Sequence, residues 1–252
     1  MNVSVNKVLA LCALISFSFN SEADDEWSFQ LEPYVMVTNI DGDASLGRVN
    51  GVGVEVDFDT ILNNLDSAAM AHFEAHHDSG WGMSLDYGYM DLSGKKTNEN
   101  GSVATAGVRQ GVLEGLGMYR TQLSTGTLDY FAGVRWWDND ISSGIYLSQL
   151  PENNFNRDVK AGWVDAVVGV RWLADINDQW TFLAQADIGG YEANFTSSIQ
   201  TGVQYEFSEL MTLDLKYKAT WVDYDEGHQG QVDYFQYDTV THGLVIGLIF
   251  KF

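Results

Sequence analysis

The sequence predicts an all-β fold, a transmembrane antiparallel up-and-down β-barrel. Three observations predict it. The chain ends in an alternating strand, residues 240–252, with one wholly apolar face. Alternating segments of about ten residues or more, enough for a tilted strand to cross a bilayer, recur along the chain. The composition is rich in aromatic residues (8 Trp, 12 Tyr, 13 Phe) and poor in proline (2), which favours strands over loops.

The terminal strand carries the clearest signal. Its apolar face consists of Leu244, Ile246, Leu248, Phe250 and Phe252. The other face mixes small residues, aliphatic residues and Lys251. A final strand of this type, in a chain with an export signal, is typical of outer-membrane barrels. We therefore expect it to close the barrel and to be the segment that the barrel-assembly machinery recognises.

The first 23 residues have the features of a signal peptide. Lys7 precedes an apolar run over residues 8–19, and Ser21-Glu22-Ala23 provides a small-x-small cleavage site. We place cleavage after Ala23, so that residues 24–252 form the barrel domain. Cys12 lies within the signal peptide, so the mature protein is expected to have no thiol chemistry.

Ten segments alternate well enough to be membrane strands: residues 27–38, 68–77, 81–92, 105–122, 128–138, 162–174, 180–191, 195–207, 211–224 and 240–252. Short turns near positions 79, 125, 177 and 209 alternate with longer or more polar connections, including 93–102 and 139–160. The short turns and the C-terminus are thus predicted to be periplasmic.

The segment 39–66 is predicted to be a long first outer loop that caps the barrel mouth. Within it, Asp59 can cap a short helix that carries Ile61, Leu62 and Leu65 on one side. Residues 52–58 could form a short strand. Because this region could supply a full strand, eight or twelve strands remain alternatives to ten.

One predicted strand, residues 105–122, contains a conflict. Alternation places Glu114 with Val112, Leu116 and Met118 on the face assigned to lipid. A charge there costs about 2–4 kcal/mol at mid-membrane for a basic residue and less for an acidic one. We expect a bulge that turns Glu114 inward, or a position near the interface.

Charged residues of both signs occur on the predicted inward faces. They are Glu32, His72, Glu74, His76, Asp86, Arg109, Asp129, Arg135, Asp165, Arg171, Asp187, Glu206, Asp214, Lys216 and Lys218. The spacing from acid to base is the same in Asp129/Arg135 and Asp165/Arg171. Such charges should pair, because an unpaired buried charge is expensive. The sequence leaves two alternatives open: a salt-bridged plug, or a narrow pore lined by charges.

Three histidines suggest other chemistry. His72, Glu74 and His76 share one side of a strand and could bind zinc, but a polar interior in which the histidines hydrogen-bond to nearby acids is the favoured explanation. His242 lies near the outer end of the last strand, where lipid-modifying enzymes could place a base, but no serine occupies an evident nucleophile position. We assign no catalytic residue, no metal ligand and no cofactor. The acidic stretch 223–233 lacks the spacing of a dedicated calcium loop.

The net charge of −22 argues against nucleic acid as a partner, because phosphates would be repelled. The expected partners are outer-membrane lipid and lipopolysaccharide, with divalent cations as bridges to the acidic loops. An acidic surface suited to a salty habitat is the simpler alternative. We expect a monomer.

Several motifs resemble those of a broad group of Gram-negative outer-membrane β-barrel proteins without assigned activity. They are Trp27–Tyr34 followed by Asp41-Gly-Asp43, Phe58–Asp66, Gly169–Trp172, Asp187–Gly190 and His242-Gly243 near the terminal Phe252. The resemblance implies a barrel in the outer membrane and carries over no functional residue. The sequence thus predicts a porin-like or transport-associated barrel. A closed structural or surface-interaction barrel is the alternative, and a lipid-modifying enzyme is a third.

Overall fold

A computed structural model describes residues 26–46, 49–146, 155–231 and 234–252. The predicted signal peptide lies outside these ranges. The described residues form eleven strands and one helix: β1 (Trp27–Leu46), β2 (Val49–Val56), α1 (Phe58–Asn64), β3 (Leu65–His77), β4 (Trp81–Thr97), β5 (Val103–Leu123), β6 (Gly126–Tyr146), β7 (Phe155–Asp175), β8 (Trp180–Tyr191), β9 (Phe195–Ser208), β10 (Met211–Glu226) and β11 (Phe235–Lys251). Over the described ranges, no helix is long and apolar enough to cross a membrane.

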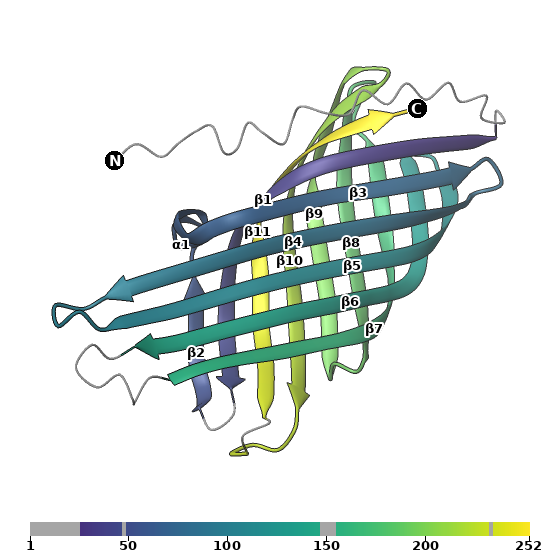
Figure 1. The fold of residues 1–252 in the computed structure, drawn as a ribbon. Helices are drawn as coiled ribbons and strands as arrows, with labels where there is room; N and C mark the ends of the chain where they lie inside the picture. The colour runs from purple at the N-terminus through teal and green to yellow at the C-terminus, as the bar shows by residue number, and fades with distance from the viewer. Residues whose placement is uncertain (1–25, 47–48, 147–154, 232–233) are drawn as a thin grey trace.

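The strands form one antiparallel sheet that closes on itself (Figure 1). Each strand from β3 to β11 pairs with its sequence neighbour, and β1 pairs with both β3 and β11. The hydrogen-bonded ring therefore consists of β1 and β3–β11. Because closure leaves no open edge along this seam, the backbone groups of the first and last strands are satisfied within the ring.

The predicted total of ten strands is wrong, because the described residues contain an eleventh, β2. Strand β1 is long enough to pair with two different strands along the same edge. Its first part, Trp27–Pro33, pairs with β3, and its last part, Ile40–Leu46, pairs with β2. The segment 39–66 is thus not a continuous loop. It supplies the end of β1, the short strand β2, the helix and the start of β3.

Helix α1 fills the interval between β2 and β3. Its N-cap is Asp57 and not the predicted Asp59: the Asp57 side chain accepts a 2.8 Å hydrogen bond from the amide of Thr60. This bond lowers the pKa of Asp57, because it stabilises the charged carboxylate. Ile61 is buried and packs with Ile40 and Met90, whereas Leu62 is exposed. The amide of Phe58 also donates a 3.1 Å hydrogen bond to Oδ1 of Asn39. The helix therefore attaches to the barrel wall through the packing of Ile61 and this hydrogen bond.

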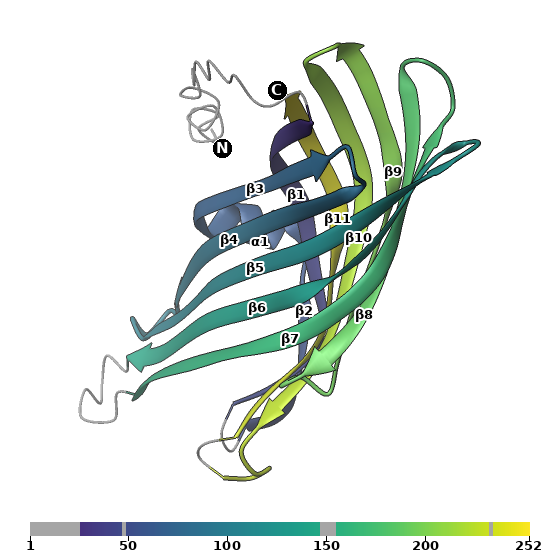
Figure 2. The ribbon, with the colours of Figure 1, turned by 90° about the vertical axis from the view of Figure 1, so that its right-hand side faces the viewer.

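Several strands extend well beyond the predicted limits. β5, β6 and β7 each contain 21 residues, about twice the length needed to cross a bilayer. The segments 93–102 and 139–160 were predicted as loops, but β4 continues to Thr97, β6 to Tyr146, and β7 begins at Phe155. In Figure 2, the far ends of β4–β7 stand apart from those of β1, β2, β10 and β11. The outer end of the barrel consequently has two lobes.

The exterior is apolar across the middle of the barrel. Leu244 and Ile246 of β11 face outward and are exposed, while Val245 between them is fully buried. Trp81, Tyr119 and Tyr130 lie in register on the outside near the short turns. Tyr87, Leu113 and Trp136 lie in register on the outside six residues further along their strands. Aromatic residues on an apolar outer surface are typical of a barrel in a bilayer.

Candidate functional site

The interior of the barrel is ionic. Of the charged residues predicted to face inward, all but Arg109 do so. Arg109 is exposed on the outside of β5, where it lies 3.5 Å from Asp91 and 3.7 Å from Asp140. The prediction for this residue is therefore wrong.

The error in β5 has a simple cause. The strand pairs with β4 and β6 without a register shift, so there is no bulge. The inward face of β5 carries Glu114, Leu116 and Met118. The sequence analysis had assigned this face to lipid, because the residues beside Glu114 on it are apolar. The same face carries Arg120, which the sequence analysis missed. The two faces were exchanged because apolar side chains also lie inside the barrel. The charges of Glu114 and Arg120, which lie on the same face, could have identified that face as the inward one.

The largest ion-pair cluster is centred on Arg171. Its guanidinium donates to both carboxylate oxygens of Glu74, at 2.7 Å each, and to Asp129 at 2.7 and 3.0 Å. Arg120 donates to Asp129 at 2.7 and 2.9 Å. Asp129 is fully buried and Glu74 nearly so. Four charges from four strands, β3, β5, β6 and β7, thereby join opposite parts of the wall, with bidentate geometry that favours guanidinium–carboxylate pairs.

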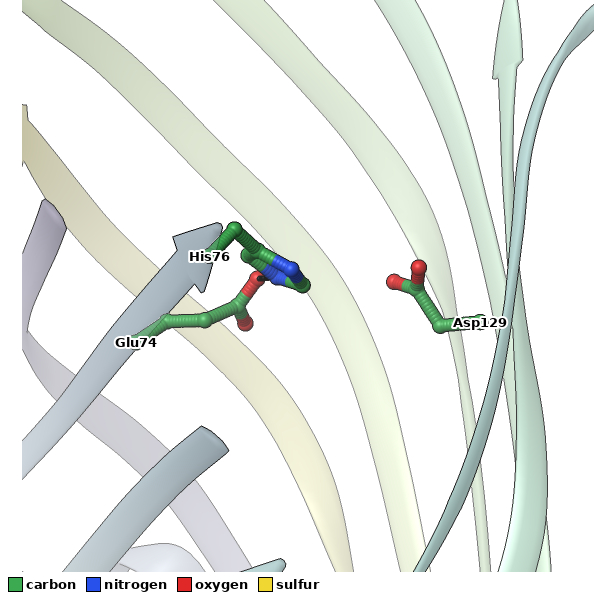
Figure 3. A group of neighbouring side chains, drawn as sticks. All are labelled: Glu74, His76 and Asp129. Carbon is green, nitrogen blue, oxygen red and sulfur yellow. Dashed lines mark hydrogen bonds and ion pairs between the residues drawn. The ribbon is translucent and has the colours of Figure 1, made fainter. Parts of the chain in front are cut away.

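The histidines extend this cluster. His76 bonds to Glu74, and His72 lies between two carboxylates, 3.2 Å from Glu74 and 3.3 Å from Asp86. Figure 3 shows Glu74 and His76 together on β3, with Asp129 opposite. Ligand atoms of these three residues lie within 4.8 Å of one another. However, two arginines already neutralise Glu74 and Asp129, so a divalent cation would have to displace strong partners. The geometry supports a hydrogen-bonded ionic interior and not the zinc hypothesis.

A second cluster surrounds Arg135. This residue pairs with Glu114 at 2.5 Å and with Asp187 at 3.1 Å, and it donates to the Thr196 hydroxyl at 3.1 Å. Asp165, the residue in register with Arg135, instead accepts a 2.8 Å hydrogen bond from the amide of Ala193.

A third cluster lies near the closing seam. Lys216 pairs with Asp214 at 2.5 Å and with Glu32 at 3.1 Å. Gly247 makes room for this pair, because a Cβ atom there would lie 2.0 Å from Oε1 of Glu32. Glu206 pairs with Lys251 of the last strand. Among the described residues, Lys218 lines the same interior without a carboxylate at ion-pair distance.

Little free space remains between the clusters. The central cavity has a volume of about 60 Å³. Its lining includes Tyr34, Glu74, Arg171 and Lys218. At roughly 15 Å³ per water, it holds about four waters. This volume is suited to hydration of the ion pairs and is too small for an organic solute.

Apolar packing fills the outer part of the interior. Trp163 of β7 stacks on Tyr224 of β10 with ring centroids 4.1 Å apart, and on Trp137 of β6 at 5.5 Å. These residues belong to a buried cluster that also includes Phe235 and Tyr237 of β11. Gln110 of β5 donates to the Tyr237 hydroxyl at 3.1 Å. The two lobes are thus joined inside the mouth by aromatic contacts.

His242 lies outside the barrel in a short hydrogen-bonded chain. Its Nε2 is 2.7 Å from Asp41 and its Nδ1 is 2.6 Å from the hydroxyl of Tyr217. An acid and an imidazole in this order can orient a base. The adjacent hydroxyl is a phenol, and the strand positions in register with His242, Asn39 and Ala219, provide no aliphatic hydroxyl. The arrangement is that of a hydrogen-bonded interfacial histidine.

Comparisons with known proteins agree on the fold. The chain matches no protein-family model, and a search of curated proteins found no significant match. It is similar in structure to the translocator domain of autotransporter NalP from Neisseria meningitidis, with a TM-score of 0.52, 13% identity, and coverage of 90% of this chain and 88% of that one. It is also similar to the outer membrane protease OmpT from Escherichia coli, with a TM-score of 0.50, 8% identity, and coverage of 91% and 98%. The chain has the fold of a Gram-negative outer-membrane β-barrel.

Proposed function

We propose that the protein is a monomeric outer-membrane barrel whose interior is closed, and that it acts through its outer surface instead of conducting solutes. The observation that carries this proposal is the Arg171 cluster, which spans the interior with bidentate bonds to Glu74 and Asp129. The outward apolar band supports an outer-membrane location, since apolar side chains face lipid on the outside of a membrane barrel.

Two further observations support closure. The central cavity has room for about four waters, and the aromatic cluster around Trp163 packs β6 and β7 against β10 and β11. A porin-like channel would need both barriers to open. The geometry therefore favours the closed alternative over the porin-like one that the sequence suggested first.

Single-channel recording in a planar lipid bilayer tests the proposal. The wild-type barrel is expected to be silent. The charge-neutral double variant Arg171→Ala/Glu74→Ala removes the centre of the plug and is expected to show transient conductance. The matched control is Lys160→Ala/Asp140→Ala, which removes an exterior pair at 3.3 Å and should remain silent. A reproducible wild-type conductance that changes when Arg135 or Arg171 is neutralised would establish a pore and refute closure.

A further inference from the structure

The exterior of β4–β7 carries three consecutive rows of outward side chains, aligned by the strand register. The first row is apolar and consists of Tyr87, Leu113, Trp136 and Val164. All four side chains are exposed. This row is the outer limit of the apolar band and faces acyl chains if the protein is in the outer membrane.

The second row is a hollow. It consists of Tyr89, Gly111, Asp138 and Gly162. Two of its four positions have no side chain, and a Cβ atom at Gly111 would approach nothing closer than 3.9 Å. The surface pocket that includes this hollow extends from the first row to Arg109, Asp140 and Lys160 and has a volume of about 190 Å³. Rings of Tyr89 and Trp136 line it.

The third row is ionic and alternates in sign: Asp91, Arg109, Asp140 and Lys160. The pairs within it are long, at 3.3 to 3.7 Å, compared with about 2.7–2.9 Å for a charge-assisted hydrogen bond. Arg109 and Lys160 are also exposed. Both cations therefore retain hydrogen-bond donors for a further partner.

We infer that this exterior groove binds a phosphorylated glycolipid of the outer leaflet. The inference rests on the proposed membrane location. The order of chemistry along the groove matches such a lipid: acyl chains against the first row, a sugar ring in the hollow, and a phosphate on Arg109 and Lys160. Guanidinium and ammonium groups are the usual partners of phosphate oxygens. The aromatic rings and Asp138 suit a sugar, because the rings cover its apolar face and the carboxylate accepts from its hydroxyls or amides.

The groove is less acidic than the chain as a whole. The complete sequence has 35 acidic and 13 basic residues, whereas the groove has the two cations Arg109 and Lys160 beside three carboxylates, Asp91, Asp138 and Asp140. Arg109 and Lys160 are held next to each other around Asp140. A phosphate that contacts both cations competes with Asp140 for their hydrogen-bond donors, and the acyl chains hold the lipid against the first row.

Native mass spectrometry of the folded barrel in detergent, titrated with defined lipids, tests the inference. The probes are a synthetic monophosphorylated diglucosamine lipid, its dephosphorylated form, and phosphatidylglycerol. The wild type is expected to retain the phosphorylated glycolipid at least about tenfold better than the dephosphorylated form, because only the phosphate accepts charge-assisted hydrogen bonds from Arg109 and Lys160. It should also prefer this glycolipid to phosphatidylglycerol.

Three variants give the test its controls. Arg109→Gln/Lys160→Gln should reduce binding of the phosphorylated lipid to that of the dephosphorylated form. Gly111→Leu should weaken both glycolipids by filling the hollow. Lys95→Gln/Lys96→Gln removes the same charge at exposed positions of β4 and should change nothing. Equal binding of phosphatidylglycerol, or an equal loss in the Lys95/Lys96 variant, would overturn the inference. Neither result depends on whether the barrel conducts ions.

Discussion

Arg171 is the centre of the largest ion-pair cluster in the described interior. It is buried and donates four hydrogen bonds to Glu74 and Asp129. Replacing it with methionine leaves two buried carboxylates with Arg120 as their remaining arginine. Breaking a buried pair from one side typically costs about 3–5 kcal/mol. We therefore expect Arg171→Met to lower the free energy of unfolding by about this amount, measured by urea titration of tryptophan fluorescence in detergent micelles.

Arg109→Met provides the comparison for this prediction. Arg109 forms only long contacts on the exterior, and exposed pairs contribute about 0–1 kcal/mol. Its loss should change the free energy of unfolding by less than about 1 kcal/mol in micelles free of glycolipid. If the two variants were equally stable, the interior ion pairs would not support the fold as argued.

At the level of residues, the sequence was most informative where charges alternate with apolar residues and least where both faces contain apolar residues. In β11 the small residues marked the interior, and Val245 is fully buried. In β5 both faces carry large apolar residues, so the assignment was reversed and Arg109 was placed inside. The ion pairs could not be predicted from strand register alone. Arg135, for example, pairs with Glu114 and Asp187 and not with Asp165, which is in register with it. That choice depends on side-chain reach across the lumen.

Among the elements, α1 has one buried residue, Ile61, for its packing against the barrel wall. Ile61 is 5% exposed, whereas the neighbouring Leu62 is 40% exposed. Truncating a buried isoleucine to alanine typically costs about 2–5 kcal/mol, so Ile61→Ala should release the helix locally. Hydrogen exchange in residues 57–64 is expected to increase, while exchange in β10 and β11 stays the same. Leu62→Ala should change neither region, and protection of the helix in Ile61→Ala would show that other contacts hold it.

At the same level, turn lengths located the short turns correctly, but polarity misplaced the strand ends. Residues 139–146 were predicted as loop because they include Asp140, Ser142 and Ser143. They nevertheless continue β6, since all eight pair with residues of β5 and residues 139–145 also pair with residues of β7. Beyond the bilayer the pattern of side chains no longer needs an apolar face. Backbone hydrogen bonds alone hold the strand there, and they require no particular pattern of side chains in the sequence.

For the whole molecule, the two-lobed outer end follows from unequal strand lengths. β8 pairs with β7 only as far as the Asp165–Tyr191 pair, although β7 begins at Phe155. On the other side, β2 pairs with β1 and not with β4. The ring is therefore continuous through the apolar band and interrupted above it. Since unpaired backbone is tolerated in water and not in hydrocarbon, these interruptions belong outside the hydrocarbon layer of the membrane.

Strand and turn lengths predict the orientation of the molecule. The turn at residues 98–101, between the long strands β4 and β5, should face the cell exterior, and the short turn at 176–179 should face the periplasm. Cys12 is the only cysteine in the sequence and lies in the predicted signal peptide, so the mature chain provides a background without thiols. Gly101→Cys should react with a membrane-impermeant maleimide on intact cells. Asn177→Cys should react only after the outer membrane is permeabilised, and labelling in the reverse order would require the lobes, the ionic row and the proposed glycolipid groove to face the periplasm.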